Sequence, residues 1–286
     1  MTAPFLGDAL GPRGRRRVLV ATVVSGAGLV GLAYVVIARL VESGQLHARL
    51  WTPLLEPGTI RFLLGGLANT VKAAVVAMVL SIAAGIVLAL GRLARSLPLR
   101  VVTGTYVEFF RAVPLILLIL FCGIGLPRYG VDLGVFWFLV LGLTIYNGAV
   151  LGEIFRAGVM SLDRGQHEAA SAVGLTYRQS MALVVLPQAA RRMLPAIVSQ
   201  LVTLLKDTSL GVVITYEELL RRGRIAGEFS HNLLQSLLVV AVVYILVNTA
   251  LSSVARRLEA RQRRRYRAGP IKVTGVEDLA VLNAGS

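Results

Sequence analysis

The sequence has few charged residues and a single cysteine. Charged residues make up 16% of the 286 residues, whereas about a quarter is usual in soluble globular domains. Hydrophobic residues make up 56%, so the composition predicts a membrane protein that crosses the bilayer several times. The one cysteine, Cys122, lies inside an apolar run and excludes an internal disulfide.

Lysine is also scarce, and this bears on nucleotide chemistry. The only lysines are Lys72, Lys206 and Lys272, and none of them follows a glycine in the phosphate-loop pattern G-x4-G-K-[ST]. We therefore expect the chain not to be an enzyme that hydrolyses ATP through such a loop. The three histidines lie far apart and show no metal-ligand spacing, so we expect neither a metal nor a cofactor in this chain.

The net charge of +15 would suggest a nucleic-acid partner in a soluble chain. Here the basic residues lie at the ends of apolar runs, and no interleaved basic and aromatic pattern accompanies them. Basic residues at span ends are typical of membrane orientation signals. We therefore expect a lipid bilayer, and no nucleic acid, as the partner of this charge.

The first apolar run predicts an additional transmembrane helix over residues 18–38. A basic segment, 1–17, precedes it, which is also typical of a signal peptide. The run is long enough to cross roughly 30 Å of hydrocarbon. No small-x-small cleavage site follows before Arg39, so we expect the helix to be retained and residues 1–17 to be cytosolic.

Further apolar runs predict five more spans, over residues 60–90, 105–125, 135–155, 193–216 and 233–254. The fold class that follows is an all-α polytopic membrane protein with about six transmembrane helices. We expect residues 126–134 and 217–231 to be extracytoplasmic loops. Residues 256–286 are expected to form a basic cytosolic tail near anionic lipid.

Charge and parity agree on the orientation of these spans. Twenty Lys and Arg residues lie in the proposed cytosolic segments and seven in the proposed outside segments. That excess favours a cytosolic N-terminus. Four crossings then return the chain to the cytosol before Glu168.

The polar stretch 163–187 predicts two short helices that meet at an angle. Asp163 with Gln166, and Thr176 with Gln179, each fit a helix cap and its partner three residues later. Gly174 fits the end of the first helix, because glycine tolerates the left-handed backbone there. We expect the second helix to run toward Pro187.

The first of these helices is expected to be amphipathic. Its predicted exposed side chain is Glu168, and its predicted buried side chains are Ala169, Ala170 and Val173. A chance amphipathic loop between two membrane helices is the alternative interpretation of this pattern.

The spacing within the same stretch is specific. It resembles the EAA loop of ABC-importer permeases, whose signature is E-A-A-x3-G-x9-I-x-L-P. The matching residues are Glu168, Ala169, Ala170, Gly174, Leu186 and Pro187, and Val184 stands where the family has Ile.

Two other segments resemble the polar amino-acid uptake family, which includes glutamate, glutamine and histidine permeases. One is the run Phe110-Arg111-Ala112-Val113-Pro114-Leu115, and the other is Lys206-Asp207-Thr208-Ser209. On physical grounds Pro114 favours a helix kink. Glu108 and Arg111 are three residues apart and could pair on one helix face.

The resemblance implies a five-helix ABC type I importer core over residues 60–255, preceded by the extra helix. The implied partners are a separate ATP-binding subunit that holds ATP and Mg, a second permease subunit and an extracytoplasmic solute-binding protein. The EAA residues named above would couple to the ATPase. The substrate would be a polar amino acid, with an acidic one suggested by the basic chain, and the location a bacterial cell membrane with both termini cytosolic.

We also expect a translocation pathway, lined by Lys206, Asp207, Thr208 and Ser209, with Arg111 and Pro114 as further candidates. Lys206 lies fourteen residues beyond Arg192, roughly 21 Å along a helix and past the midplane of a core about 30 Å thick. A charge facing lipid there costs on the order of 3 kcal/mol.

Two alternatives remain open at this point. The charged residues of the fifth span could instead form a structural ion pair with a neighbouring helix. A self-contained channel or secondary transporter is the alternative function, although the internal repeats typical of such transporters are absent from the sequence.

Overall fold

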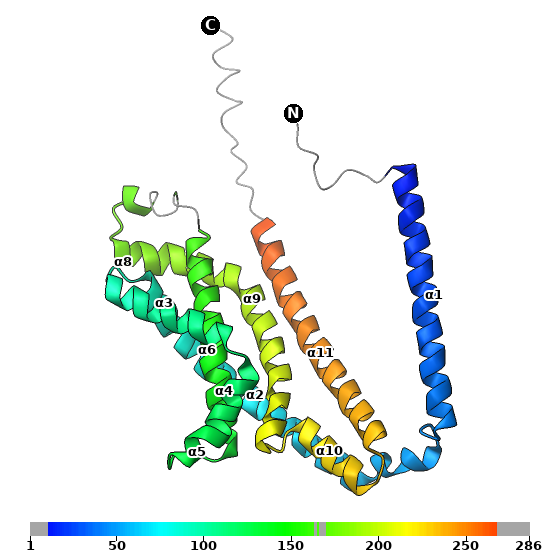
Figure 1. Cartoon of the computed structure of the whole chain (residues 1–286). Coiled ribbons are helices and arrows are strands. Elements are labelled where there is room, and N and C mark those ends of the chain that lie inside the picture. The colour runs from blue at the N-terminus through cyan, green and yellow to red at the C-terminus, as the bar shows by residue number, and fades with distance from the viewer. Residues whose placement is uncertain (1–10, 163–164, 166–169, 268–286) are drawn as a thin grey trace.

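Residues 11–162, 165 and 170–267 are described by the computed structural model, and their regular secondary structure is entirely helical. Figure 1 shows the arrangement. The elements are α1 (Pro12–Glu42), η1 (Ala48–Leu50), η2 (Thr52–Leu55), α2 (Pro57–Leu93), α3 (Leu97–Ala112), α4 (Leu115–Leu120), η3 (Phe121–Gly125), α5 (Leu126–Arg128), α6 (Val135–Met160), α8 (Tyr177–Ser180), η4 (Met181–Val185), α9 (Leu186–Asp207), η5 (Thr208–Ile214), α10 (Leu219–Phe229) and α11 (Leu233–Arg267).

Five helical segments of the described chain are long and apolar enough to cross a membrane. They are α1, α2, α6, the continuous stretch Arg178–Ile214 and the first part of α11. A sixth span results if the bent pair Leu97–Ala112 and Leu115–Arg128 counts as one. The all-α polytopic fold is therefore confirmed. When the bent pair counts as one span, five spans follow α1.

The two ends of the bundle differ, and we name them by what they hold. The end that carries α8 and residues 170–176 is called the loop end, and α1 begins and α11 finishes at this same end (Figure 1). The other end carries α5 and α10 and is called the far end.

The third span differs from the single kinked helix that the sequence predicts. The helix begins at Leu97 rather than near residue 105. At Val113 and Pro114 the chain bends by 99° into α4. Pro114 has no N–H to continue the α3 ladder, so it breaks the span into two helices.

Small residues let α2 and α6 approach closely. A Cβ built on Gly85 would lie 2.9 Å from the Cβ of Leu151, and one on Gly152 would lie 3.1 Å from the Cβ of Leu88. Small residues at helix interfaces allow this approach in membrane proteins. Gly85 and Gly152 therefore set the close approach of α2 and α6.

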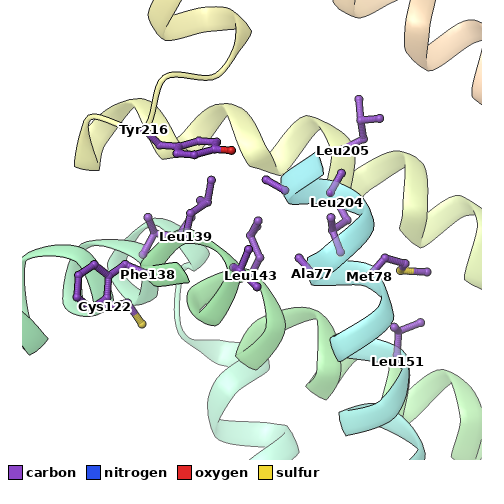
Figure 2. Close-up of a cluster of buried hydrophobic side chains, with 14 of the residues drawn as sticks. Ala77, Met78, Cys122, Phe138, Leu139, Leu143, Leu151, Leu204, Leu205 and Tyr216 are labelled. Carbon is purple, nitrogen blue, oxygen red and sulfur yellow. The ribbon is translucent and has the colours of Figure 1, made fainter. Parts of the chain in front are cut away.

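The apolar core lies around this contact. Ala77 and Met78 of α2, Leu143 and Leu151 of α6 and Leu204 of α9 are buried together. Figure 2 shows these side chains turned toward one another between the helices. The long helices α2, α6 and α9 therefore form one packed unit.

The C-terminal third contains two features that the sequence interpretation missed. Residues 217–231, expected as a loop, contain the eleven-residue helix α10. α11 continues beyond the predicted span end at Val254 as far as Arg267. The charged residues of the first segment suggested a loop, and those of the second suggested a tail. Helix α10 is nevertheless stable, because its first turn is capped and because it packs closely against α2 and α11.

Helix α1 stands apart from the packed unit (Figure 1). None of its residues is buried. The connection that follows it is tied to the start of α11, because Gln235 donates a 2.6 Å hydrogen bond to the Gln45 carbonyl and Asn232 donates a 2.7 Å bond to the Leu50 carbonyl. These hydrogen bonds hold the C-terminal end of α1 in place, while the helix itself does not pack against the other helices.

Candidate functional site

The helix that precedes Gly174 ends in a Schellman motif. Gly174 has φ +83°, and its N–H donates to the Ser171 carbonyl at 3.0 Å. The N–H of Leu175 donates to the Ala170 carbonyl at 3.1 Å. These two bonds close the motif around a left-handed residue, so the conformation predicted for Gly174 is confirmed.

The next helix opens with the predicted capping box. The Thr176 N–H donates to Oε1 of Gln179 at 2.9 Å, and the Gln179 N–H donates to Oγ1 of Thr176 at 3.4 Å. The two bonds satisfy backbone donors that the helix start would leave unpaired. Two capped helix ends therefore meet across residues 174–176, as the sequence predicts.

Burial in this loop follows the prediction only in part. Ala170 is buried, as expected. Val173 is 76% exposed, so the prediction of its burial is wrong. It lies directly before the left-handed Gly174, where the chain turns away from the core. The predictions for Asp163, Gln166, Glu168 and Ala169 lie outside the described residues.

The helix does not stop at Leu186 and Pro187. It passes through the π-helical segment η4 directly into α9, where Pro187 occupies the first turn. A proline ring clashes with the carbonyl four residues earlier and offers no N–H, and a wider π turn relieves both conflicts. η3 has the same construction, since it leads straight into Leu126 and Pro127.

The loop region exposes a group of apolar side chains. Val173, Leu183 and Leu186 are 76%, 66% and 43% exposed, and Met160 at the end of α6 is 63% exposed. Pro187 is exposed beside them. These residues give the described part of the loop end several exposed apolar side chains.

Two contacts fasten the loop to the core. The Arg192 guanidinium donates a 2.7 Å hydrogen bond to the Ser161 carbonyl at the C-terminus of α6, where a cation also favours the helix dipole. Met193 packs onto Gly158, and a Cβ on Gly158 would overlap its side chain. The two helices that flank the loop are therefore joined at its base.

A charge cluster lies on α2, α3 and α6. Arg92 contacts Glu153 at 2.5 Å and Glu108 at 3.8 Å, and Arg156 contacts Glu153 at 2.6 Å. Glu108 therefore pairs with Arg92 rather than with Arg111, in contrast to the pairing considered from the sequence. Arg111 is exposed, and its charge acts on Glu153.

The structure separates the predicted pathway residues into two groups. Arg111 belongs to the charge cluster, and Pro114 is the exposed N-cap of α4. Lys206 and Ser209 instead line a groove of about 730 Å³ between the α9–η5 junction, α10 and α11.

The two remaining pathway residues lie behind this groove. Thr208 is fully buried and donates a 2.7 Å hydrogen bond to the Leu205 carbonyl. Asp207 is half-buried. Among the described residues neither Lys206 nor Asp207 forms an ion pair with another helix, so the structural ion-pair alternative has no support in the geometry.

Sequence reasoning missed a buried carboxylate at the start of α10. Glu218 accepts from the N–H groups of Leu220 and Arg221 at 2.8 and 2.7 Å, and from the Tyr244 hydroxyl at 2.7 Å. Burial raises the pKa of Glu218. The three hydrogen bonds lower it, but by a smaller amount, so the pKa stays above the ordinary value of a glutamate. The carboxylate caps α10 and ties it to α11.

The polar residues on α11 were also missed. Tyr244, Asn248, Ser252 and Arg256 line the same groove as Lys206. They recur at every fourth position of the span, a helical period that could have been found in the sequence. The apolar residues around them hid the pattern.

The fold is similar to a crystal structure of an amino acid ABC transporter with histidines, with a TM-score of 0.69 and 28% identity. That similarity covers 71% of this chain and 95% of the other chain.

The sequence comparisons lead to the same class. The chain is 40% identical over 234 residues to the glutamate transport system permease protein GluD of Corynebacterium glutamicum, covering 80% of this chain and 84% of the relative. It is 40% identical over 206 residues to the probable glutamine ABC transporter permease protein GlnP of Bacillus subtilis, covering 71% of this chain and 94% of that protein.

Residues 81–264 match the family described as binding-protein-dependent transport system inner membrane component. The chain belongs to this family, and it is a multi-pass membrane permease. The family assignment places the capped loop and the groove within a transport protein.

Proposed function

We propose that this chain is the membrane-spanning permease subunit of an ATP-driven importer of polar amino acids. It works with a separate ATP-binding subunit that holds ATP and Mg, with a second permease subunit and with a solute-binding protein outside the cell. The observation that carries the proposal is the capped loop around Gly174 with its exposed apolar side chains. We further propose that the loop end lies on the cytosolic side of a bacterial cell membrane, with both termini cytosolic.

The loop supplies a docking surface for the ATP-binding subunit. Val173, Leu183 and Leu186 offer apolar contact area, which gains free energy when a partner removes it from water. The EAA residues Glu168, Ala169 and Ala170, with Leu186 and Pro187, form the same segment of sequence. A rigid loop loses less entropy on docking than a flexible one, and the Schellman motif and capping box supply that rigidity.

Movement of the loop reaches the core through its base. Arg192 links α9 to the end of α6 through its hydrogen bond to the Ser161 carbonyl. The Met193 side chain packs directly against Gly158 of α6. α6 in turn packs closely on α2. When ATP closes the two ATP-binding subunits, the docked loops move together, and these helices carry the displacement to the far end. The pathway then opens alternately to the two sides of the membrane.

Support for an amino-acid substrate comes from the relatives and from the groove. The two relatives described above are named as a glutamate permease and a probable glutamine permease. A third relative, which is 34% identical, is named as an arginine transport system permease protein. Lys206 lines the groove and carries an ammonium group, a group that binds the carboxylate of an amino acid.

Coupling is tested by replacing Gly174 with valine. A left-handed backbone costs a residue with a Cβ about 1–2 kcal/mol, so the Schellman turn of Gly174→Val shifts and docking weakens. We expect substrate-stimulated ATPase activity of the reconstituted complex to fall about tenfold or more, the factor that about 1.4 kcal/mol represents.

The chain provides a matched control for this experiment. Gly130 has the same φ of +83°, and a Cβ there also meets open space, but it lies at the far end after α5. Gly130→Val therefore carries the same backbone strain and should retain stimulated activity. Equal activity in the two variants would refute the coupling role of Gly174.

A further inference from the structure

Another pocket lies where α3 passes beside α2 and α6. Its volume is about 330 Å³, and most of the residues that line it are polar. Three helices contribute them, because α3 contacts both α2 and α6. The lining residues used below are Arg92, Arg100, Gly104, Thr105, Glu108 and Arg156. This space is called the α3 pocket.

Two arginines of the α3 pocket are held in place by one carboxylate. Arg92 of α2 contacts Glu153 at 2.5 Å, and Arg156 of α6 contacts the same carboxylate at 2.6 Å. The Arg92 side chain is only 16% exposed. Both arginines also line the pocket, so two fixed guanidinium groups stand close together on its wall.

The arginines keep N–H groups for a ligand. Nη2 of Arg92 lies 3.8 Å from Glu108, too far for a hydrogen bond, and the Glu108 side chain is 75% exposed. The Arg100 side chain makes no hydrogen bond or ion pair with any residue that the structure describes. Since a guanidinium group carries five N–H donors, the pocket offers donors that no described acceptor uses.

The charges around the α3 pocket do not balance. Three arginines line it, and Glu108 is the only lining carboxylate in the described part of the chain. Outside the lining, Glu153 adds a negative charge, and Arg111, whose charge acts on Glu153, adds a positive one. Four arginines therefore stand against two carboxylates, and an excess of positive charge attracts an anion.

The pocket lies at the depth of lipid headgroups. α6 has 26 residues and is therefore about 39 Å long, close to the roughly 40–45 Å of a bilayer with its headgroups. Arg156 lies four residues, about 6 Å, before Met160, where α6 ends at the loop end (Figure 1). Because the headgroup layer of each leaflet is about 5–8 Å thick by the same dimensions, Arg156 lies at the level of the headgroups.

Apolar side chains of α3 lie next to these arginines. Val101, Val102 and Phe109 are 55%, 67% and 59% exposed. A helix with polar and apolar sides of this kind lies at a membrane surface with its apolar side against acyl chains. A Cβ on Gly104 would meet nothing within 4 Å, so the space beside the arginines is open.

We propose that the α3 pocket binds the phosphate group of an anionic phospholipid. Guanidinium groups hold phosphate oxygens through paired hydrogen bonds, and basic pockets between membrane helices bind acidic headgroups. Arg92 and Arg156 supply the fixed donors and Arg100 the unpaired ones. Free phosphate shares this chemistry, but the depth of the pocket and its apolar neighbours favour a lipid, whose acyl chains lie along Val101 and Val102.

The test compares two short-chain lipids with the same acyl chains. Equilibrium binding of radiolabelled dioctanoyl phosphatidylglycerol, which is anionic, and of dioctanoyl phosphatidylcholine, which is net neutral, is measured on the purified full-length chain in neutral detergent, with protein-free micelles as the blank. We expect phosphatidylglycerol to bind about tenfold more tightly, because the arginines repel the choline cation. Added inorganic phosphate should displace phosphatidylglycerol.

Three variants locate the binding. Arg100→Gln should weaken phosphatidylglycerol binding about tenfold, the factor that one charge-assisted hydrogen bond represents. Gly104→Leu should also weaken it, because the added side chain fills the pocket without changing its charge. Arg16→Gln is the matched control, since it removes an exposed cation at the start of α1, also at the loop end, and should leave binding unchanged.

Several results would overturn the proposal. Equal binding of the two lipids by the wild type would do so, as would a preference that survives both Arg100→Gln and Gly104→Leu. Loss of the preference in Arg16→Gln would show a general effect of charge instead of a site. If the wild type binds radiolabelled inorganic phosphate more tightly than phosphatidylglycerol, the pocket is a site for soluble phosphate and not for a lipid. None of these results bears on the importer function.

Discussion

At the scale of single residues, Glu218 shows how one carboxylate joins two helices. It accepts three hydrogen bonds, two from the backbone of α10 and one from Tyr244 of α11. No pattern in the sequence marks it, because its partner Tyr244 is twenty-six residues away. In contrast, Gly174 and Thr176 act through neighbours within five residues, and the sequence alone predicted their conformations.

The raised pKa of Glu218 makes stability depend on pH. Because the folded carboxyl holds its proton more tightly than the unfolded one, this group's contribution is fully present below its ordinary pKa. This stabilising contribution is lost as the pH rises through the raised pKa of the folded carboxyl group. The melting temperature of the wild type should therefore fall relative to Glu218→Gln as pH rises above the ordinary range of a glutamate.

Melting curves of the purified complex across a pH series measure this difference. Glu217→Gln is the matched control, since the Glu217 side chain is 56% exposed and its ion pair among the described residues is with Arg222. Its melting temperature should run parallel to the wild type. A Glu218→Gln curve that also runs parallel would contradict the assignment.

At the scale of elements, the length of the apolar runs was enough to predict most of the membrane spans. Local chemistry, such as a proline, determined where a span breaks. The runs that became α1, α2, α6 and α11 were predicted from hydrophobicity, since each is long enough to cross the membrane unbroken. The third span was also predicted from its apolar run, but its break into two helices was not, because the effect of Pro114 depends on whether neighbours hold the helix together across it. Its surroundings allowed a 99° bend.

Close packing of α2 on α6 makes Gly85 sensitive to a single methyl group. A Cβ there would lie 2.9 Å from the Leu151 Cβ and 3.1 Å from the Gly152 backbone nitrogen. Since the backbone cannot move aside, Gly85→Ala should destabilise the protein by about 1–3 kcal/mol. Thermal unfolding of the purified protein measures this loss.

Gly104 provides the comparison for Gly85. It also lies within a helix, but a Cβ there meets nothing within 4 Å. Gly104→Ala should be neutral or stabilise by up to about 1 kcal/mol through helix propensity. Equal melting temperatures for the two variants would mean that the α2–α6 contact is looser than the structure shows.

At the scale of the whole molecule, the loop end and the far end must lie on opposite sides of the membrane. The sequence predicts this from the distribution of basic residues. The loop around Gly174 could be recognised in the sequence because its spacing is local. The groove lined by Lys206 and Tyr244 could not, because it is formed by three segments that meet only in the folded chain.

The single, buried Cys122 allows a direct test of orientation. The native protein should react little with a membrane-impermeant maleimide, so cysteines placed at exposed serines report on each side. Ser43→Cys, after α1, should be labelled on intact cells. Ser96→Cys, before α3, should be labelled only after the cells are opened. The reverse pattern would invert the topology and remove the loop from the reach of a cytosolic ATPase.

The π-helical segment η4 has a consequence for the angle at which the loop is held. An α-helix turns by about 100° per residue, so the extra residue of a π turn rotates everything before it relative to an unbroken α-helix. The side chains of α8 are therefore set by the length of Met181–Val185 as well as by α9. Deleting one residue from this segment would turn the proposed docking side of α8 by more than a quarter of a revolution relative to α9.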